Sequence, residues 1–389
     1  MNQAELYQWQ GQIRHEFKDL GYWQALNLGL YSYGMVLAKH CAPSRVREKL
    51  QGIAKMESIQ RRLERWLANA RIDWQSCCRA WAGWVLRCWQ GEKLFLLVDE
   101  TKLGQHMNVM VVGLAYRGGC IPLAFWCYAP DAWPDSQVGL ISQLLSWIAP
   151  SIPAGCVPIV QADRGLATSP RLIQAVTALG WQYLFRVQNN THCRDVNDTD
   201  QPLSKLLLVP SQEVHMSGQV FKKVGWLSMD IHVLWGRVYK EPWCLVSNCP
   251  ELNGWEYATR YWQEASFRDL KSDGWQWQQS HIFTPAHANL LVLAMSLAYA
   301  WTLTLGVLAF DDPTLYQLVG KGQRCQYSLF RLGLRFTKPS SPPARILPVH
   351  FLISRRVPCH ALKPAPRPKV SVREAMRERG GGEGFHNTL

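Results

Sequence analysis

The sequence predicts an α/β protein in which a mixed β-sheet is flanked by helices and is preceded by a helical region. Residues 1–90 place apolar side chains at helical spacing, whereas from residue 94 short apolar runs follow, two of which end at an aspartate. From there, strands and helices are predicted in the order β-β-β-α-β-α-β. This order is typical of a mixed sheet with helices on its faces.

The length and the charge distribution of the chain limit the kinds of protein and partner to consider. The chain has 389 residues, 48% of them hydrophobic, which is enough for a large core and more than one domain. The net charge of +13 is unevenly distributed: residues 1–90 carry 13 basic and 7 acidic side chains, residues 91–319 carry 15 and 19, and residues 320–389 carry 14 and 3. The basic ends indicate a nucleic acid or an anionic membrane as partner, although solvated lysines and arginines would give the same count.

The twelve cysteines form no zinc-binding or disulfide pattern. No C-x2-C pair is followed by a second pair or by paired histidines, and several cysteines lie inside apolar runs. Reduced thiols in a cytoplasmic protein are the simplest interpretation. The first 20 residues include charged side chains and no apolar segment, so we expect no signal peptide.

The N-terminal region contains a basic amphipathic helix at Ser58–Asn69. Apolar residues recur there at helical spacing, with Arg61, Arg62 and Arg65 beside them. Such a helix would either lie along a DNA backbone or pack against a neighbouring helix, and the local sequence leaves both alternatives open.

The sheet is predicted from five apolar runs, which cover residues 94–98, 109–116, 120–128, 157–162 and 181–187. An Arg-Gly-Gly turn between the second and third runs predicts an antiparallel hairpin. Helices are predicted at 136–149 and from Pro170 to Gly180, where Ser169 would cap the first turn.

Residues 189–250 are expected to form a β-rich insertion. Asparagine and aspartate residues mark loops at its start, and short strands are predicted around Gln219–Trp226, Met229–Leu234 and Trp243–Ser247. After residue 320 the chain is rich in proline and arginine, with linker-like segments at 340–343 and 363–369 and a glycine-rich end that we expect to be disordered.

The uncharged stretch Leu290–Phe310 is long enough to span a membrane. It contains Ser296, Thr302 and Thr304, and it closely follows a segment with many polar side chains. We therefore expect a buried core helix.

That polar segment, Tyr257–Lys271, predicts a stripe of functional side chains. Read as a helix at about 100° per residue, it places the four residues at roughly 0°, 300°, 340° and 320°, in the order Tyr257, Arg260, Glu264 and Lys271. A carboxylate, two cations and a phenol then leave one face within about 60°. Such a face suits a metal ion and phosphate groups better than bulk solvent.

Two further carboxylates are expected to meet Glu264. Asp99 and Asp163 each follow a buried strand, and an open sheet presents its site at the carboxyl ends of its strands. Three carboxylates offer the hard oxygen ligands that Mg²⁺ or Mn²⁺ prefers, and two such ions about 3.5–4 Å apart can drive phosphodiester chemistry. Each acid taken alone would be read as a helix cap or a turn residue, and the coincidence of three weakens that interpretation.

These motifs resemble the bacterial insertion-sequence transposases of the DDE type, in particular insertion sequence family four. The signature of that family, Y-x2-R-x3-E-x6-K, is satisfied at every spacing by Tyr257, Arg260, Glu264 and Lys271. Val98-Asp99-Glu-Thr resembles its first acidic motif, and Ala162-Asp163-Arg164-Gly165 resembles its second. Ser58–Asn69 resembles its upstream R-R-L-x-R-x-L-A-N segment, so the resemblance covers roughly residues 45–310.

The resemblance implies a ribonuclease-H-like core at 91–188 and 251–319, interrupted by the β-rich insertion at 189–250. Residues 1–90 would form a helical DNA-binding region, and 320–389 a basic, partly disordered C-terminal region without a matching motif. The implied partner is double-stranded DNA, both the terminal inverted repeats and the target. Paired ends need two catalytic centres, which implies a homodimer on DNA in the bacterial cytoplasm and no membrane partner.

The resemblance also implies roles for individual residues. Asp99, Asp163 and Glu264 would bind two Mg²⁺ ions, for which Mn²⁺ would substitute. Water would nick one strand and expose a 3′-OH, which then attacks the opposite strand to form a hairpin or attacks target DNA. Sequence leaves two alternatives open: a nuclease of the same fold without strand transfer, and a DNA-binding relative that has lost catalysis.

DNA contacts follow from the same resemblance. The cations of Arg260 and Lys271 would hold phosphates near the cleaved bond, with Arg164 beside them. The hydroxyl of Tyr257 would bond a phosphate near the terminus. A tryptophan of the insertion would stack on a flipped base, and the best match is Trp243, with Trp226 and Trp235 as rivals.

Overall fold

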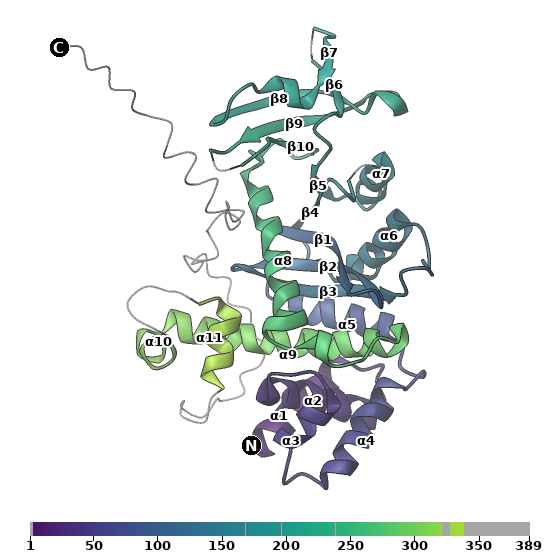
Figure 1. Cartoon of the computed structure of the whole chain (residues 1–389), viewed down its shortest axis with the longest axis vertical. Helices are drawn as coiled ribbons and strands as arrows, with labels where there is room; N and C mark the ends of the chain where they lie inside the picture. The colour runs from purple at the N-terminus through teal and green to yellow at the C-terminus, as the bar shows by residue number, and fades with distance from the viewer. Residues whose placement is uncertain (1–2, 168, 196, 238, 321–326, 338–389) are drawn as a thin grey trace, which may run out of the picture.

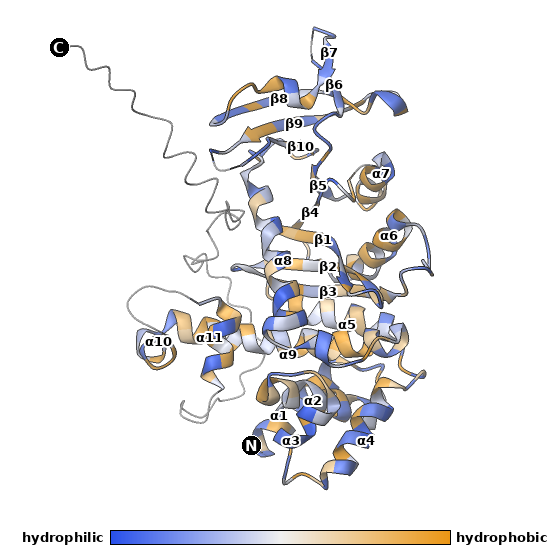
Figure 2. Ribbon diagram, in the orientation of Figure 1, coloured by the Kyte–Doolittle hydropathy of each residue, from blue (hydrophilic) through white to orange (hydrophobic). Residues whose placement is uncertain are grey.

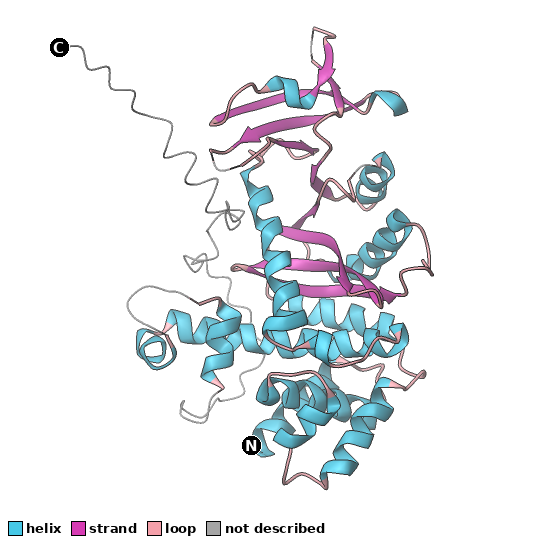
Figure 3. Ribbon diagram, in the orientation of Figure 1, coloured by secondary structure: helices cyan, strands magenta, loops and turns pink. Residues whose placement is uncertain are grey.

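The structure, a computed structural model, describes residues 3–337 except for 168, 196, 238 and 321–326 (Figure 1). The predicted linker-like segments at 340–343 and 363–369 and the glycine-rich end lie outside the described residues. The chain is a mixed α/β protein with helices flanking a mixed sheet, as the sequence predicts, and the strands of the predicted insertion join that sheet to give ten strands. Figure 3 shows the strands in the upper part of an elongated molecule and most helices at the lower end.

The first half of the sheet contains the five predicted strands: β1 (Lys93–Leu103), β2 (Met107–Tyr116), β3 (Gly119–Tyr128), β4 (Val157–Ala162) and β5 (Gln182–Arg186). β2 and β3 form the predicted antiparallel hairpin, and β2 also pairs antiparallel with β1. β1, β4 and β5 run parallel to one another. β4 ends at Ala162, directly before Asp163, as predicted, but β1 continues through Asp99 to Leu103, so the predicted end of the first strand at Asp99 is wrong.

The second half of the sheet comes from β6 (His192–Arg194), β7 (Asp200–Pro202), β8 (Gln212–Val220), β9 (Leu227–Trp235) and β10 (Trp243–Ser247). All of them pair antiparallel, and β10 joins β5, so these strands continue the central sheet. The strand predicted around Gln219–Trp226 is wrong beyond Val220. There the chain leaves the extended conformation, because Phe221, Gly225 and Trp226 all have positive φ angles.

The helices before the sheet are α1 (Gln3–Glu16), α2 (Tyr22–Ala38), α3 (Pro43–Lys49), α4 (Met56–Leu67) and α5 (Trp74–Leu86). In α4 the apolar residues Ile59, Leu63 and Trp66 are buried, and Figure 2 shows apolar and polar residues alternating along this helix. Arg61 and Arg65 are exposed. The basic amphipathic helix therefore packs against its neighbours and also presents cations to solvent.

Two predicted helices cover one face of the sheet (Figure 1): α6 (Gln137–Ile148) and α7 (Pro170–Ala178). The side chain of Ser169 accepts a hydrogen bond from the backbone N–H of Arg171, which confirms the predicted cap. Short 3₁₀ turns connect the larger elements: η1 (Ala149–Ser151), η2 (Leu203–Leu206), η3 (Lys222–Val224) and η6 (Trp277–Gln279).

The long apolar helix α9 (Pro285–Asp311) is a core helix. By length and composition it could cross a membrane, but its most apolar window is buried along its whole length inside the protein. It packs against α2, β3 and the short helix α11 (Leu329–Phe336), while α10 (Pro313–Val319) follows its C-terminus. The buried-core prediction for Leu290–Phe310 is confirmed.

The predicted functional helix is less regular than expected. Tyr257–Lys271 begins in a 3₁₀ turn, η4 (Trp255–Arg260), continues as α8 (Tyr261–Arg268) and ends in a π-helical turn, η5 (Asp269–Asp273). The wider last turn is closed by tertiary contacts: the carbonyl of Asp269 accepts from the backbone N–H of Trp275, and Gly274 lies against Phe330. The uniform 100° spacing expected from sequence therefore holds only in the middle.

Candidate active site

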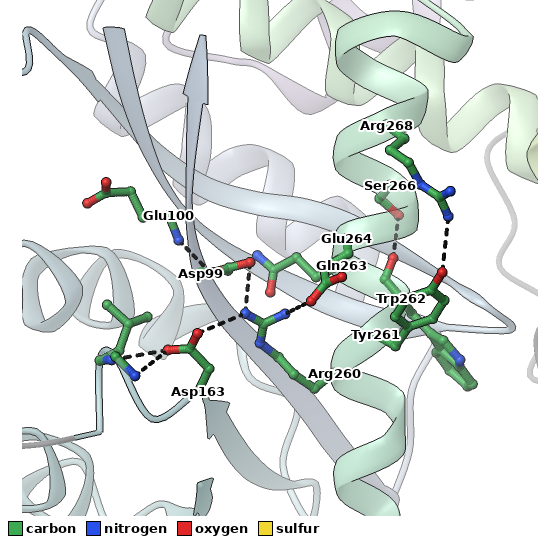
Figure 4. A network of polar contacts seen from close by, with 12 residues as sticks. Asp99, Glu100, Asp163, Arg260, Tyr261, Trp262, Gln263, Glu264, Ser266 and Arg268 are labelled. Atoms are coloured by element: carbon green, nitrogen blue, oxygen red, sulfur yellow. Dashed lines mark hydrogen bonds and ion pairs between the residues drawn. The ribbon is translucent and has the colours of Figure 1, made fainter. Parts of the chain in front are cut away.

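Three carboxylates converge on one guanidinium group beside the sheet (Figure 4). Nη2 of Arg260 lies 2.9 Å from an oxygen of Asp99 and 3.7 Å from an oxygen of Asp163. Nη1 of the same side chain lies 3.4 Å from an oxygen of Glu264. The structure thus brings together the three acids that the sequence singles out, and it places Arg260 among them.

Parallel pairing of β1 with β4 positions the two aspartates. Val98 and Ala162 are register partners, so Asp99, which lies within β1, is level with Asp163, which directly follows β4. Asp163 leaves the strand in a tight turn, because its Oδ1 accepts hydrogen bonds from the backbone N–H groups of Gly165 and Leu166 at 2.9 and 3.1 Å. This turn fixes the carboxylate relative to the end of β4.

The third acid depends on how η4 and α8 dock against the sheet. Gln161, a buried residue of β4, donates to the carbonyl of Glu256 at 3.0 Å and accepts from the hydroxyl of Thr259 at 3.0 Å. Ser266 accepts from the backbone N–H of Cys120 on β3 at 2.7 Å. The sequence analysis did not identify either residue. A polar glutamine inside the apolar run 157–162 did indicate that Gln161 would need a buried hydrogen-bond partner.

The three carboxylates differ in their exposure to solvent, and Asp163, at 41%, lies between the other two. The side chain of Asp99 is 14% exposed, whereas that of Glu264 is 56% exposed. Burial raises the pKa of Asp99 to about 7; the charge of Arg260 opposes that rise, and the charge of Asp163 adds to it. Burial also disfavours the charge on Arg260, but the surrounding carboxylates outweigh it and raise the pKa of Arg260 above its usual range. The cluster is therefore a charged site that is partly withdrawn from water.

Lys271 reaches the same site from the π-helical turn. Its Nζ donates to Oγ1 of Thr101 at 2.9 Å, and Thr101 lies on the same face of β1 as Asp99. Burial lowers the pKa of Lys271, and the charge of Asp99 opposes that shift. The sequence identified Lys271 but gave no sign of Thr101 as its partner.

Arg164 directly follows Asp163, but its side chain belongs to a second cluster around Glu241. Its Nη1 donates to Oε1 of Glu241 at 2.7 Å. The same glutamate also accepts from Arg186 at 2.8 Å and from Asn189 at 2.9 Å. Glu241 therefore ties the loop before β10 to the ends of β4 and β5, a role that no sequence pattern revealed.

The aromatic residues beside the site form a partly exposed group. Tyr257 is 5% exposed, and its ring meets that of Trp243 edge-on, with centroids 5.4 Å apart. Trp255 lies beside Trp243 and is 40% exposed. Of the two rival tryptophans, Trp226 lies under the guanidinium of Arg194, and Trp235 donates to the carbonyl of Tyr239.

The three carboxylates match the ligand chemistry of a magnesium site. Asp99 from β1, Asp163 from the turn after β4 and Glu264 from α8 supply hard oxygen ligands, which suit Mg²⁺ or Mn²⁺. As the side chains stand, no three His, Cys, Asp or Glu residues in the described part of the chain are arranged to hold an ion directly. Because Arg260 contacts all three carboxylates, a cation at these oxygens requires that guanidinium to move aside.

The raised pKa of Asp269, in the π-helical turn, should make the stability of the protein depend on pH. Burial raises its pKa to about 8, although Arg331 opposes the shift, whereas an aspartate in an unfolded chain titrates near 4. Between these values the folded state binds more protons than the unfolded state, so stability falls as pH rises from about 4 to about 8. We expect a higher melting temperature at pH 6.5 than at pH 8.5, and a smaller difference in Asp269→Asn.

Thermal melting by circular dichroism at both pH values checks this expectation. Asp99 acts in the same direction, so the variant should reduce the pH difference without removing it. Wild type and Asp269→Asn melting with identical pH dependence would contradict the assignment.

The comparisons with known proteins identify no family for this chain. A scan against protein-family models finds no match to the chain, and a search of the curated proteins finds no significant match.

Proposed function

We propose that this protein is a DDE-type DNA transposase that binds the ends of an insertion sequence, cleaves a strand there and transfers the end to new DNA. The observation that carries the proposal is the convergence of Asp99, Asp163 and Glu264 on one point, 2.9, 3.7 and 3.4 Å from Arg260. These acids come from segments up to 165 positions apart in sequence, between Asp99 and Glu264. If the three acids were only helix caps or turn residues, nothing would favour their lying around one guanidinium.

The finer fold belongs to the same proposal. We take residues 91–188 and 251–319 as a ribonuclease-H-like core, with 189–250 as its β-stranded insertion. The sheet order supports this division, because β10 returns from the insertion to pair with β5 and the chain then enters the segment that carries Glu264. The exposed arginines of α4 support a DNA-binding role for residues 1–90.

Each residue of the site then has a chemical task. Two Mg²⁺ ions held by Asp99, Asp163 and Glu264 would supply an activated oxygen nucleophile and stabilise the leaving oxygen. Arg260 and Lys271 would bind DNA phosphates as charged hydrogen-bond donors. Arg164 would bind the backbone nearby, Tyr257 would bond a terminal phosphate, and Trp243 would stack on an unpaired base.

A cleavage assay tests the proposal. The purified full-length chain would be incubated with a duplex that carries the terminal inverted repeat found beside its coding region, with Mg²⁺ or Mn²⁺. We expect a nick that exposes a 3′-OH at the repeat, a joined product when target DNA is added, and neither product with EDTA. Native gel electrophoresis should show two DNA ends in one complex, as a homodimer on paired ends requires.

The outcomes separate the proposed function from its alternatives. Nicking without any joined product would favour a nuclease of the same fold. Binding of the repeat without cleavage under either cation would contradict the enzyme and leave a DNA-binding protein. Short inverted repeats and a target duplication around the coding region would favour transposition over both.

A further inference from the structure

Arg260 lies among the three carboxylates without all of its hydrogen-bonding groups being satisfied. Its side chain is only 8% exposed, yet just one of its three acid contacts, the one to Asp99 at 2.9 Å, has an ordinary hydrogen-bond length. The contacts to Asp163 and Glu264 are longer, at 3.7 and 3.4 Å. Its Nε is buried and has no hydrogen-bond partner in the described structure. The guanidinium neutralises the cluster without being fully satisfied there.

A divalent cation would compete with the Arg260 guanidinium for the oxygens of the three carboxylates. Three carboxylates face one guanidinium, while the nearby Lys271 donates to Thr101. A divalent cation and Arg260 would therefore use the same oxygens, and both cannot occupy the centre of the cluster. A guanidinium also binds phosphate oxygens in a bidentate way, which offers it a second site once DNA is present.

We propose that Arg260 is an internal counter-ion that closes the carboxylate cluster in the DNA-free protein, and that a DNA phosphate opens it to divalent cations by drawing the guanidinium away. The proposal rests on the proposed function, because it takes the three acids as the cation site and Arg260 as a phosphate contact. Cation and DNA binding are then coupled. By linkage each tightens the other by the same factor.

Manganese binding tests this coupling directly, with the free Mn²⁺ signal in electron paramagnetic resonance as the readout. We expect DNA-free Arg260→Gln to bind Mn²⁺ at least tenfold more tightly than wild type. The matched control is Arg186→Gln, which removes the same charge from an arginine that is held by Glu241 outside the carboxylate cluster. That control should change the affinity less than twofold.

A second arm adds a 30-base-pair duplex that ends in the inverted repeat. We expect the duplex to tighten Mn²⁺ binding by wild type at least tenfold and by Arg260→Gln less than threefold. Asp99→Asn with the same duplex gives the Mn²⁺ bound by DNA alone. Thermal melting is an independent check: Mn²⁺ should raise the melting temperature of Arg260→Gln more than that of wild type.

Failure of this inference and failure of the proposed function give different results. If Asp99→Asn loses Mn²⁺ binding but Arg260→Gln binds no more tightly than wild type, the counter-ion role is overturned and the cation site stands. If Asp99→Asn binds Mn²⁺ as well as Arg260→Gln does, the cation site fails and the counter-ion role fails with it.

Discussion

Glu264→Gln is expected to lower the rate of DNA end cleavage about a thousandfold or more. In the proposed mechanism its carboxylate helps to hold the ions that stabilise both oxygens of the displacement, a contribution of several kcal/mol to the transition state. A loss of about 4 kcal/mol corresponds to about a thousandfold in rate. Asp99→Asn and Asp163→Asn should have effects of similar size.

Single-turnover cleavage of the labelled inverted repeat measures this effect, and electrophoretic mobility shift measures DNA binding beside it. Binding should persist, because the acids repel the DNA backbone and the cations around them remain. Glu251→Gln is the matched control, since Glu251 is an exposed glutamate paired with Lys93 outside the cluster. Equal cleavage by wild type and Glu264→Gln would overturn the site assignment.

Gly306→Ala is expected to lower the free energy of unfolding by about 3 kcal/mol, at the upper end of overpacking effects. A Cβ at Gly306 of α9 would lie 1.8 Å from the carbonyl oxygen of Leu329 on α11. At the same crossing, a Cβ at Gly333 would lie 1.9 Å from the carbonyl oxygen of Thr302. Backbone atoms cannot rotate aside, so the two helices would have to separate.

Urea unfolding followed by tryptophan fluorescence measures this loss, and Gly333→Ala should behave in the same way. The control is Gly11→Ala in α1, where a Cβ would meet nothing within 4 Å. Because alanine favours a helix over glycine, that variant should gain about 0.5–1 kcal/mol. If Gly306→Ala proves as stable as wild type, the close contact of α9 with α11 is wrong.

Local sequence was sufficient where one physical signal dominated. The five apolar runs predicted β1 to β5, and the Arg-Gly-Gly turn predicted the β2–β3 hairpin, because a buried strand needs a continuous apolar run and a tight turn needs glycine. The wrong strand at Gln219–Trp226 shows the limit. Apolar residues there continue past Val220, with Phe221, Val224 and Trp226, but the backbone turns at Phe221, whose positive φ the sequence does not reveal.

By itself, the sequence predicted most of the helices and strands and the buried helix Leu290–Phe310, and it singled out Asp99, Asp163, Arg260 and Glu264 as candidate site residues. Helix and strand periods are local properties, and each acid directly followed an apolar run or lay on a predicted helix face. The tertiary structure alone placed Arg260 between the three carboxylates, joined Lys271 to Thr101, and seated α11 on α9. The contacts of Arg260 with Asp99 and of Lys271 with Thr101 link residues more than 150 positions apart, and packing of the segment 257–273 against the sheet brings them together.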